Sequence, residues 1–114
     1  MILMILNDPP YGTERSYNGL RLANALAKAG QAVTVFLMAD AVACAKAGQK
    51  TPEGFYNIER MLSRLIAAGG KVLMCGTCMD ARGLEAAHLL AGAERSTMDA
   101  LAEATIAAEK VLVF

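Results

Sequence analysis

The sequence predicts an α/β fold in which a mostly parallel sheet lies between two layers of helices. Short apolar runs alternate with segments of helical periodicity along the 114 residues. Strands separated in this way by helices form βαβ units, which give parallel strands with helices on the faces of the sheet. The length suits one domain. We therefore expect a single three-layer α/β/α domain over residues 1–114.

Four apolar runs are the predicted strands. Met1–Leu6 is apolar throughout and is ended by the turn residues Asn7-Asp8-Pro9-Pro10, as expected for a strand buried on both faces. The other three runs are Ala32–Met38, Lys71–Cys75 and Lys110–Phe114. Because ligands of parallel sheets bind beyond the carboxyl ends of the strands, function is expected in the loops that follow them.

The segments between the strands predict five helices. The clearest is Glu53–Ala68, which has regular apolar spacing, Thr51 as an N-cap and Pro52 at its first position. The others are Glu14–Ala29 with Thr13 as N-cap, Ala41–Ala47 capped by Asp40, Leu84–Leu90, and a last helix to Ala108 that opens on a capping-box pattern at residues 96–99.

Composition excludes two classes of partner. Lysine plus arginine equal aspartate plus glutamate at 11 each, so the basic excess of a nucleic-acid or anionic-membrane surface is missing. The longest apolar stretch is Met1–Leu6, far below the roughly 20 residues of a membrane helix. That stretch also lacks the basic start and cleavage site of a signal peptide. We expect a cytoplasmic protein without nucleic-acid or membrane partners.

The cysteines are the main chemical signal. Cys75 and Cys78 form a C-x-x-C pair at the end of a predicted strand, a spacing typical of redox, sulfur-transfer or metal chemistry. Zinc requires four ligands, and only Cys44 and His88 could join the pair. We expect no metal and no cofactor, because Cys44 fits a helical core and His88 a structural or solvated position.

Two further interpretations of the pair stay open. A thioredoxin-like thiol pair also begins a helix after a strand, although that fold places a proline after the pair, and all three prolines here precede it. Alternatively, Cys75 is a small buried apolar residue, as free cysteines often are. We expect Cys75 to be the more reactive thiol and to form a reversible disulfide with Cys78 that Cys44 cannot join.

Several longer stretches resemble the DsrE/DsrF-like family. The resemblance rests on 6-LNDPPYGTER-15, 35-VFLMADAV-42, 48-GQKTPEGFY-56, 75-CGTCMDARG-83 and 110-KVLVF-114. It implies a flavodoxin-like three-layer subunit that assembles as a homotrimer or homohexamer. In the sulfur-relay members of the family, the cysteine at this strand end carries a persulfide, a role that maps onto Cys75. Cys78 departs from the pattern, because these members do not require a second cysteine there.

The predicted function is therefore sulfur transfer through a Cys75 persulfide, with Cys78 as a second catalytic candidate and sulfur-relay proteins as partners. The predicted pocket residues are Asn7, Asp8, Tyr11, Asp40 and Arg82. Each also has an ordinary explanation: turn formation for the first two, packing for the tyrosine, helix capping for Asp40 and a surface pair with Glu85 for Arg82. The alternative functions are a non-enzymatic, oligomeric binding module and a C-x-x-C thiol-disulfide oxidoreductase.

An oligomer is also expected from composition, because 55% hydrophobic residues are hard to bury in 114 residues. The predicted contact surfaces are a helical stripe with Leu20, Ala23 and Ala27, and the loop around Phe55 and Tyr56.

Overall fold

A computed structural model describes residues 1–52 and 55–114, and it confirms the predicted α/β fold. Five strands form one sheet in the order β4-β3-β2-β1-β5, and every neighbouring pair is parallel. Their bounds are Ile2–Leu6 for β1, Val33–Leu37 for β2, Lys71–Cys75 for β3, Ala93–Ser96 for β4 and Lys110–Val113 for β5. All five carboxyl ends therefore meet at one edge of the sheet.

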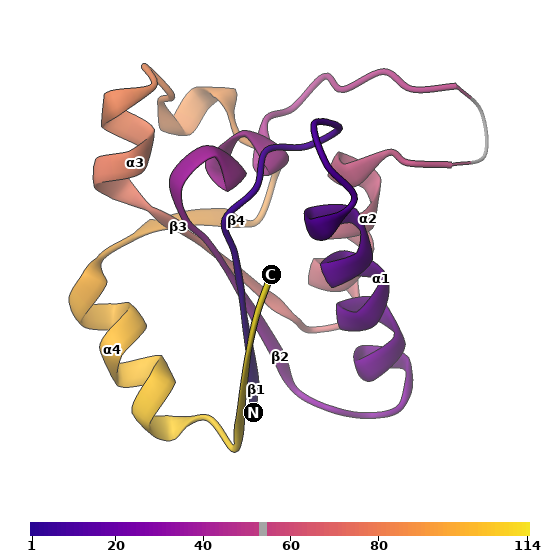
Figure 1. Cartoon of the computed structure of the whole chain (residues 1–114), viewed down its shortest axis with the longest axis vertical. Helices are drawn as coiled ribbons and strands as arrows, with labels where there is room; N and C mark the ends of the chain where they lie inside the picture. The colour runs from indigo at the N-terminus through magenta and orange to yellow at the C-terminus, as the bar shows by residue number, and fades with distance from the viewer. Residues whose placement is uncertain (53–54) are drawn as a thin grey trace.

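The helices cover the two faces unequally. The helices α1 (Arg15–Lys28) and α2 (Ile58–Ala67) lie together on one face, and α4 (Met98–Ala107) lies on the other (Figure 1). The short helix α3 (Gly76–Ala81) and the 3-10 segments η1 (Ala39–Ala45) and η2 (Ala86–His88) lie at the carboxyl-end edge. In the part of the chain that the structure describes, no helix is long and apolar enough to cross a membrane.

The core lies between the sheet and the pair α1–α2. Strand β2 is buried along its whole length, and Leu20 and Ala23 of α1 and Leu62 and Leu65 of α2 have no exposed surface. The predicted contact stripe on α1 is thus wrong. Leu20 and Ala23 belong to the core, and Ala27 packs against it.

Helix α2 begins later than predicted. Tyr56 has a φ of 66°, a left-handed conformation that an α-helix cannot continue through. The N-cap is Asn57, whose side chain accepts a hydrogen bond from the Arg60 N–H at 3.0 Å, and the Ile58 N–H donates to the Tyr11 hydroxyl at 3.1 Å. Thr51 and Pro52 therefore do not start this helix. The predicted first residue, Glu53, lies outside the described residues.

Four other helix boundaries differ from the prediction. The N-cap of α4 is Thr97, whose hydroxyl accepts a hydrogen bond from the Ala100 N–H at 3.1 Å, and not Ser96, which lies in β4. Helix α1 follows Glu14 rather than Thr13, although the Thr13 hydroxyl still accepts a hydrogen bond from the Arg15 N–H at 3.3 Å. Asp40 is not a cap, because η1 begins one residue before it, after Met38. The segment predicted as Leu84–Leu90 contains only the 3-10 turn η2.

Two elements were not predicted at all. Strand β4 has the sequence Ala-Glu-Arg-Ser, and its two middle residues are charged and exposed, so it carries no apolar run. Helix α3 is only six residues long, too short for a helical period to show in the sequence. Both elements border the cysteine pair.

Candidate functional site

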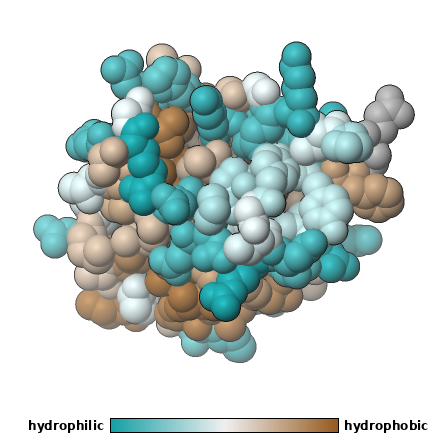
Figure 2. All heavy atoms as spheres, turned by 45° about the horizontal axis from the view of Figure 1, so that its top comes forward, coloured by the Kyte–Doolittle hydropathy of each residue, from teal (hydrophilic) through white to brown (hydrophobic). Residues whose placement is uncertain are grey.

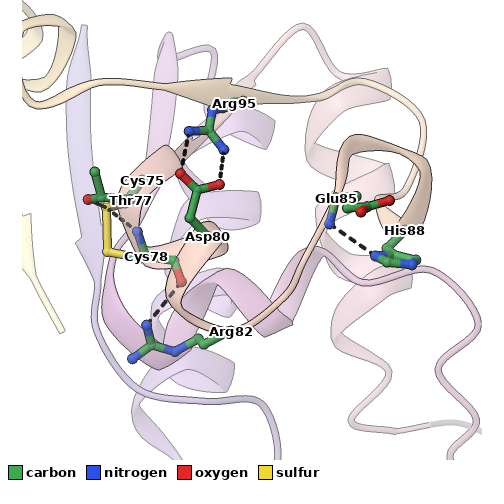
Figure 3. A network of polar contacts seen from close by, with 8 residues as sticks. All are labelled: Cys75, Thr77, Cys78, Asp80, Arg82, Glu85, His88 and Arg95. Atoms are coloured by element: carbon green, nitrogen blue, oxygen red, sulfur yellow. Dashed lines mark hydrogen bonds and ion pairs between the residues drawn. A yellow bond between two sulfur atoms is a disulfide. The ribbon is translucent and has the colours of Figure 1, made fainter.

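Cys75 and Cys78 lie where β3 passes into α3 (Figure 3). Cys75 is the last residue of β3 and the N-cap of α3, and Cys78 lies in the first turn of that helix. Their Cα atoms are 5.2 Å apart and their sulfurs are bonded as a disulfide, a separation within the usual range for such bridges. Cys75 is 7% exposed and Cys78 is half-buried.

Polar hydrogens surround both sulfurs. The Cys78 N–H donates to Cys75 Sγ at 3.2 Å, and the Thr77 hydroxyl lies 3.3 Å from the same sulfur. Cys78 Sγ accepts a hydrogen bond from the Ala39 N–H at 3.3 Å. Ala39 lies two residues after the end of β2, so parallel pairing of β2 and β3 brings this donor to the second cysteine. Such donors favour a negatively charged sulfur.

Asp40 and Arg82 also lie beside the cysteine pair. Arg82 Nε donates to Asp40 Oδ1 at 2.8 Å, and its Nη2 lies 2.8 Å from the same oxygen. Arg82 Nη1 donates to the Cys78 carbonyl at 3.0 Å (Figure 3). Arg82 thus pairs with Asp40 rather than with Glu85. Its charge is balanced by a carboxylate, so it joins η1 to α3 instead of acting as a free cation at the sulfurs.

A second ion pair covers the start of α3. Arg95 of β4 donates two hydrogen bonds to the Asp80 carboxylate, at 2.7 and 2.9 Å, and these hold the pKa of Asp80 below its ordinary value (Figure 3). A Cβ added at Gly76 would lie 2.8 Å from this guanidinium, so the glycine admits the arginine. The sequence analysis does not name Thr77, Asp80 or Arg95, and for Arg95 and its partner Asp80 the reason is that β4 carries no apolar run.

The other three predicted pocket residues form a separate loop cluster. The Asn7 amide donates to the Phe114 carbonyl at 3.2 Å, and the Asp8 carboxylate accepts from the Thr13 hydroxyl at 2.7 Å. The Tyr11 hydroxyl donates to the Gln49 side chain and accepts the Ile58 N–H. Partial burial raises the pKa of Tyr11. These contacts hold loops in place, and none of them reaches a sulfur of the cysteine pair.

Cys44 and His88 do not join the cysteine pair. Cys44 is fully buried, and its thiol lies 3.7 Å from the Asp8 carbonyl. His88 Nδ1 accepts the Glu85 N–H at 3.0 Å and lies apart from the cysteines in Figure 3. Among residues 1–52 and 55–114, no three histidine, cysteine or acidic side chains are grouped as metal ligands.

Two hollows lie on the α1–α2 side of the molecule, and neither is lined by Cys75 or Cys78. The larger, of about 730 Å³, follows the seam between α1 and α2. The smaller, of about 520 Å³, lies between the loops around Tyr11 and Thr51. Figure 2 brings the carboxyl-end edge of the sheet forward, and hydrophilic side chains dominate the middle of this view.

The chain is a parallel α/β subunit in which a cysteine pair lies at the carboxyl end of β3, at the edge where all the strands of the sheet end. The model of the DsrE/DsrF-like family matches residues 1–114, and the chain belongs to this family.

The similar proteins span nearly the whole chain. Protein YchN of Escherichia coli is 44% identical over 99% of this chain and 97% of its own, and its crystal structure superposes with a TM-score of 0.93. The uncharacterized protein MK0008 of Methanopyrus kandleri is 34% identical over 100% of this chain and 93% of its own. The solved protein MTH1491 of Methanobacterium thermoautotrophicum, at 15% identity, covers 99% of this chain and 96% of its own with a TM-score of 0.72, a likeness of fold alone.

Proposed function

We propose that this protein transfers sulfur by carrying it as a persulfide on Cys75. The observation that supports this function most directly is the environment of Cys75 Sγ, which accepts the Cys78 N–H and lies beside the Thr77 hydroxyl. Both contacts favour the thiolate, which is the form that attacks sulfur. Membership of the DsrE/DsrF-like family is consistent with this role.

The transfer is a simple exchange at sulfur. The Cys75 thiolate attacks the outer sulfur of a donor persulfide R–S–SH, the donor S–S bond breaks, and R–S⁻ leaves. Cys75 then holds –S–SH, and the thiolate of an acceptor protein removes the outer sulfur in the same way. No net oxidation occurs. We place this exchange in the cytoplasm, where thiols are kept reduced, with other sulfur-relay proteins as donor and acceptor.

Cys78 gives the persulfide a second fate. Its thiolate can attack the inner sulfur of the Cys75 persulfide, which forms the Cys75–Cys78 disulfide and releases HS⁻. The 5.2 Å separation of the two Cα atoms permits this closure. Cys78 therefore limits how long Cys75 keeps its sulfur unless an acceptor takes it first.

Intact-mass spectrometry tests the proposal. The reduced protein is incubated with a cysteine desulfurase and free cysteine, and the gain of one sulfur atom is located by peptide mapping. We expect loading on Cys75, none in Cys75→Ser, and longer retention of sulfur in Cys78→Ser. Cys44→Ser is the matched control and should load like the unmodified chain. A folded, reduced protein that takes up no sulfur would contradict the proposal and favour a binding module.

A thiol-disulfide oxidoreductase is the second candidate, because the two sulfurs are bonded in the structure. In that reaction the Cys75 thiolate attacks a substrate disulfide R–S–S–R and releases R–S⁻. Cys78 then attacks Cys75 Sγ of the mixed disulfide, which releases the second R–S⁻ and forms the bridge. Catalysed reduction of a protein disulfide in the presence of a dithiol, without sulfur loading in the desulfurase assay, would favour this function.

A further inference from the structure

The larger hollow, along the seam between α1 and α2, is strongly basic. Arg21 of α1 and Arg60 and Arg64 of α2 all line it. Arg60 and Arg64 are four residues apart, so they share one face of α2. The seam thus gathers three of the chain's 11 basic residues into one groove, although the whole chain is neutral.

These arginines have few protein partners. Among residues 1–52 and 55–114, none of the three takes part in an ion pair. Arg21 donates one hydrogen bond, to the Asn18 side chain at 3.1 Å. Glu59 is the acidic residue in the first turn of α2, and its carboxylate accepts a hydrogen bond from the Gln49 N–H. Guanidinium groups that have no ion-pair partner repel one another when they are gathered, and a bound anion would relieve that repulsion.

Aromatic rings line the same groove. The Tyr17 and Tyr56 rings stack with centroids 4.3 Å apart, and the Arg21 guanidinium lies 5.8 Å from the Tyr17 ring. The Tyr56 hydroxyl donates to Glu14 at 3.0 Å, which fixes that ring. Phe55 is 72% exposed, an unusual position for a phenylalanine. A planar ligand ring could stack on Phe55 or Tyr56.

We propose that this groove binds a free nucleotide, that is, a small molecule with a planar heteroaromatic ring and at least one phosphate. The arginines supply the geometry that phosphate oxygens prefer, and the rings supply stacking. The volume of about 730 Å³ lies within the usual range of small-molecule sites. Because the groove gathers only three basic residues on a chain that is neutral overall, a free nucleotide fits better than a nucleic acid.

The asparagines of the groove contribute to its structure rather than to base recognition. The Asn24 amide donates to the Leu20 and Met61 carbonyls, which ties α1 to α2. The Asn57 oxygen caps α2. With both amides engaged in this way, the groove offers stacking and charge rather than hydrogen bonds to base edges. We therefore expect weak discrimination between adenine and guanine nucleotides.

Titration calorimetry tests the site on the full chain with four probes: AMP, GMP, adenosine and inorganic phosphate. We expect AMP and GMP to bind with similar Kd, and adenosine and phosphate to bind at least roughly tenfold more weakly. If inorganic phosphate bound as tightly as AMP, the proposed stacking of the ligand ring would be wrong. If adenosine bound as tightly as AMP, the proposed binding of the phosphate group by the arginines would be wrong. No saturable binding at millimolar AMP would overturn all of it.

Matched charge variants locate the site. Arg60→Gln/Arg64→Gln should raise the Kd for AMP by roughly tenfold or more, because two charge-assisted contacts are lost. Lys28→Gln/Lys71→Gln removes the same charge from two exposed residues that do not line the groove and should leave the Kd within about twofold. Equal effects of the two double variants would overturn the assignment. Unchanged circular dichroism confirms that both are folded.

Two further measurements separate competing explanations. A single-stranded oligonucleotide that binds more tightly than AMP, with the same arginine dependence, would overturn the assignment to a free nucleotide. A change in molecular mass of Arg60→Gln/Arg64→Gln without nucleotide binding by the unmodified chain would show a subunit contact instead. The sulfur-loading assay uses neither the groove nor a nucleotide, so its outcome is independent of this proposal.

Discussion

The three cysteines occupy environments that give them different chemistry. Cys75 Sγ accepts a backbone N–H at the start of α3, and Cys78 Sγ accepts the Ala39 N–H. Cys44 lies fully buried, and that burial raises the pKa of its thiol to about 12. Cys44 is thus a neutral packing residue at physiological pH, and the proposed chemistry rests on the strand-end pair.

The buried thiol makes stability depend on alkaline pH. The pKa of Cys44 rises from 9.0 in the unfolded chain to about 12 in the fold, so its stabilising contribution is complete below pH 9 and is lost as the pH rises toward 12. Urea unfolding measures this effect. Between about pH 8 and about pH 10.5, we expect the free energy of unfolding to fall by on the order of 1–2 kcal/mol more in the unmodified chain than in Cys44→Ala. Equal losses in both proteins would show that Cys44 ionises freely in the fold.

Some site residues were predictable one at a time. The cysteines, Asp40 and Arg82 stand out because each follows a predicted strand, and the parallel sheet then brings Asp40 and Arg82 into contact. Asn7, Asp8 and Tyr11 satisfy the same rule, yet their side chains bind loop atoms instead. The position of a residue after a strand therefore correctly predicts at which edge of the sheet it lies. It does not predict which side chains lie close to the cysteine pair.

At the scale of elements, α3 is held by its neighbours rather than by its own length. A six-residue helix has little intrinsic stability in water. Arg82 ties it to η1 through Asp40, and Asp80 ties it to β4 through Arg95. The geometry of the cysteine pair thus depends on two ion pairs that join it to the ends of neighbouring strands.

The contact between Gly76 and Arg95 yields a double-mutant prediction. Gly76→Ala places a Cβ 2.8 Å from the Arg95 guanidinium and should displace this flexible side chain from Asp80, which lowers the free energy of unfolding because the ion pair is lost. With Arg95→Ala the clash disappears, and the same change should stabilise the helix by up to about 1 kcal/mol. Urea unfolding of the four proteins measures the coupling. A coupling near zero would show that Arg95 moves aside freely.

Sequence patterns missed β4 and misplaced the start of α2 for two different reasons. Strands β1, β2 and β3 are largely or fully buried and carry long apolar runs, whereas β4 lies at an edge and carries Glu94 and Arg95. The start of α2 was misplaced because the Thr51-Pro52 signal is locally strong. The left-handed Tyr56 and the contact from Tyr11 to Ile58 depend on tertiary structure. The local helix propensity of the sequence predicts neither the conformation of Tyr56 nor the contact from Tyr11.

At the scale of the whole molecule, the two faces of the sheet are covered unequally. Two helices cover one face, and only the ten-residue α4 covers the other (Figure 1). On the α4 side, Val111 and Val113 of the edge strand β5 are 38% and 64% exposed, and Ile106 at the end of α4 is 85% exposed. Ile5, which pairs in register with Val113, is only partly buried. We refer to these residues together as the apolar surface, because the described part of the chain leaves them exposed or partly exposed.

This apolar surface is where we expect copies of the chain to associate. The expected trimer or hexamer would bury Ile106, Val111 and Val113, and each buried apolar side chain of this size contributes about 1.5–3 kcal/mol. Light scattering after size exclusion should therefore give a multiple of the 12.0 kDa chain mass. Ile106→Lys/Val113→Lys should shift it toward one chain, because two charges would otherwise be buried without partners. Ser63→Lys, an exposed position on α2 at the other face, is the control and should leave the mass unchanged. If the unmodified protein had the mass of one chain at high concentration, the oligomer would be ruled out. If only Ser63→Lys dissociated the oligomer, the contact between subunits would lie on the α1–α2 face instead.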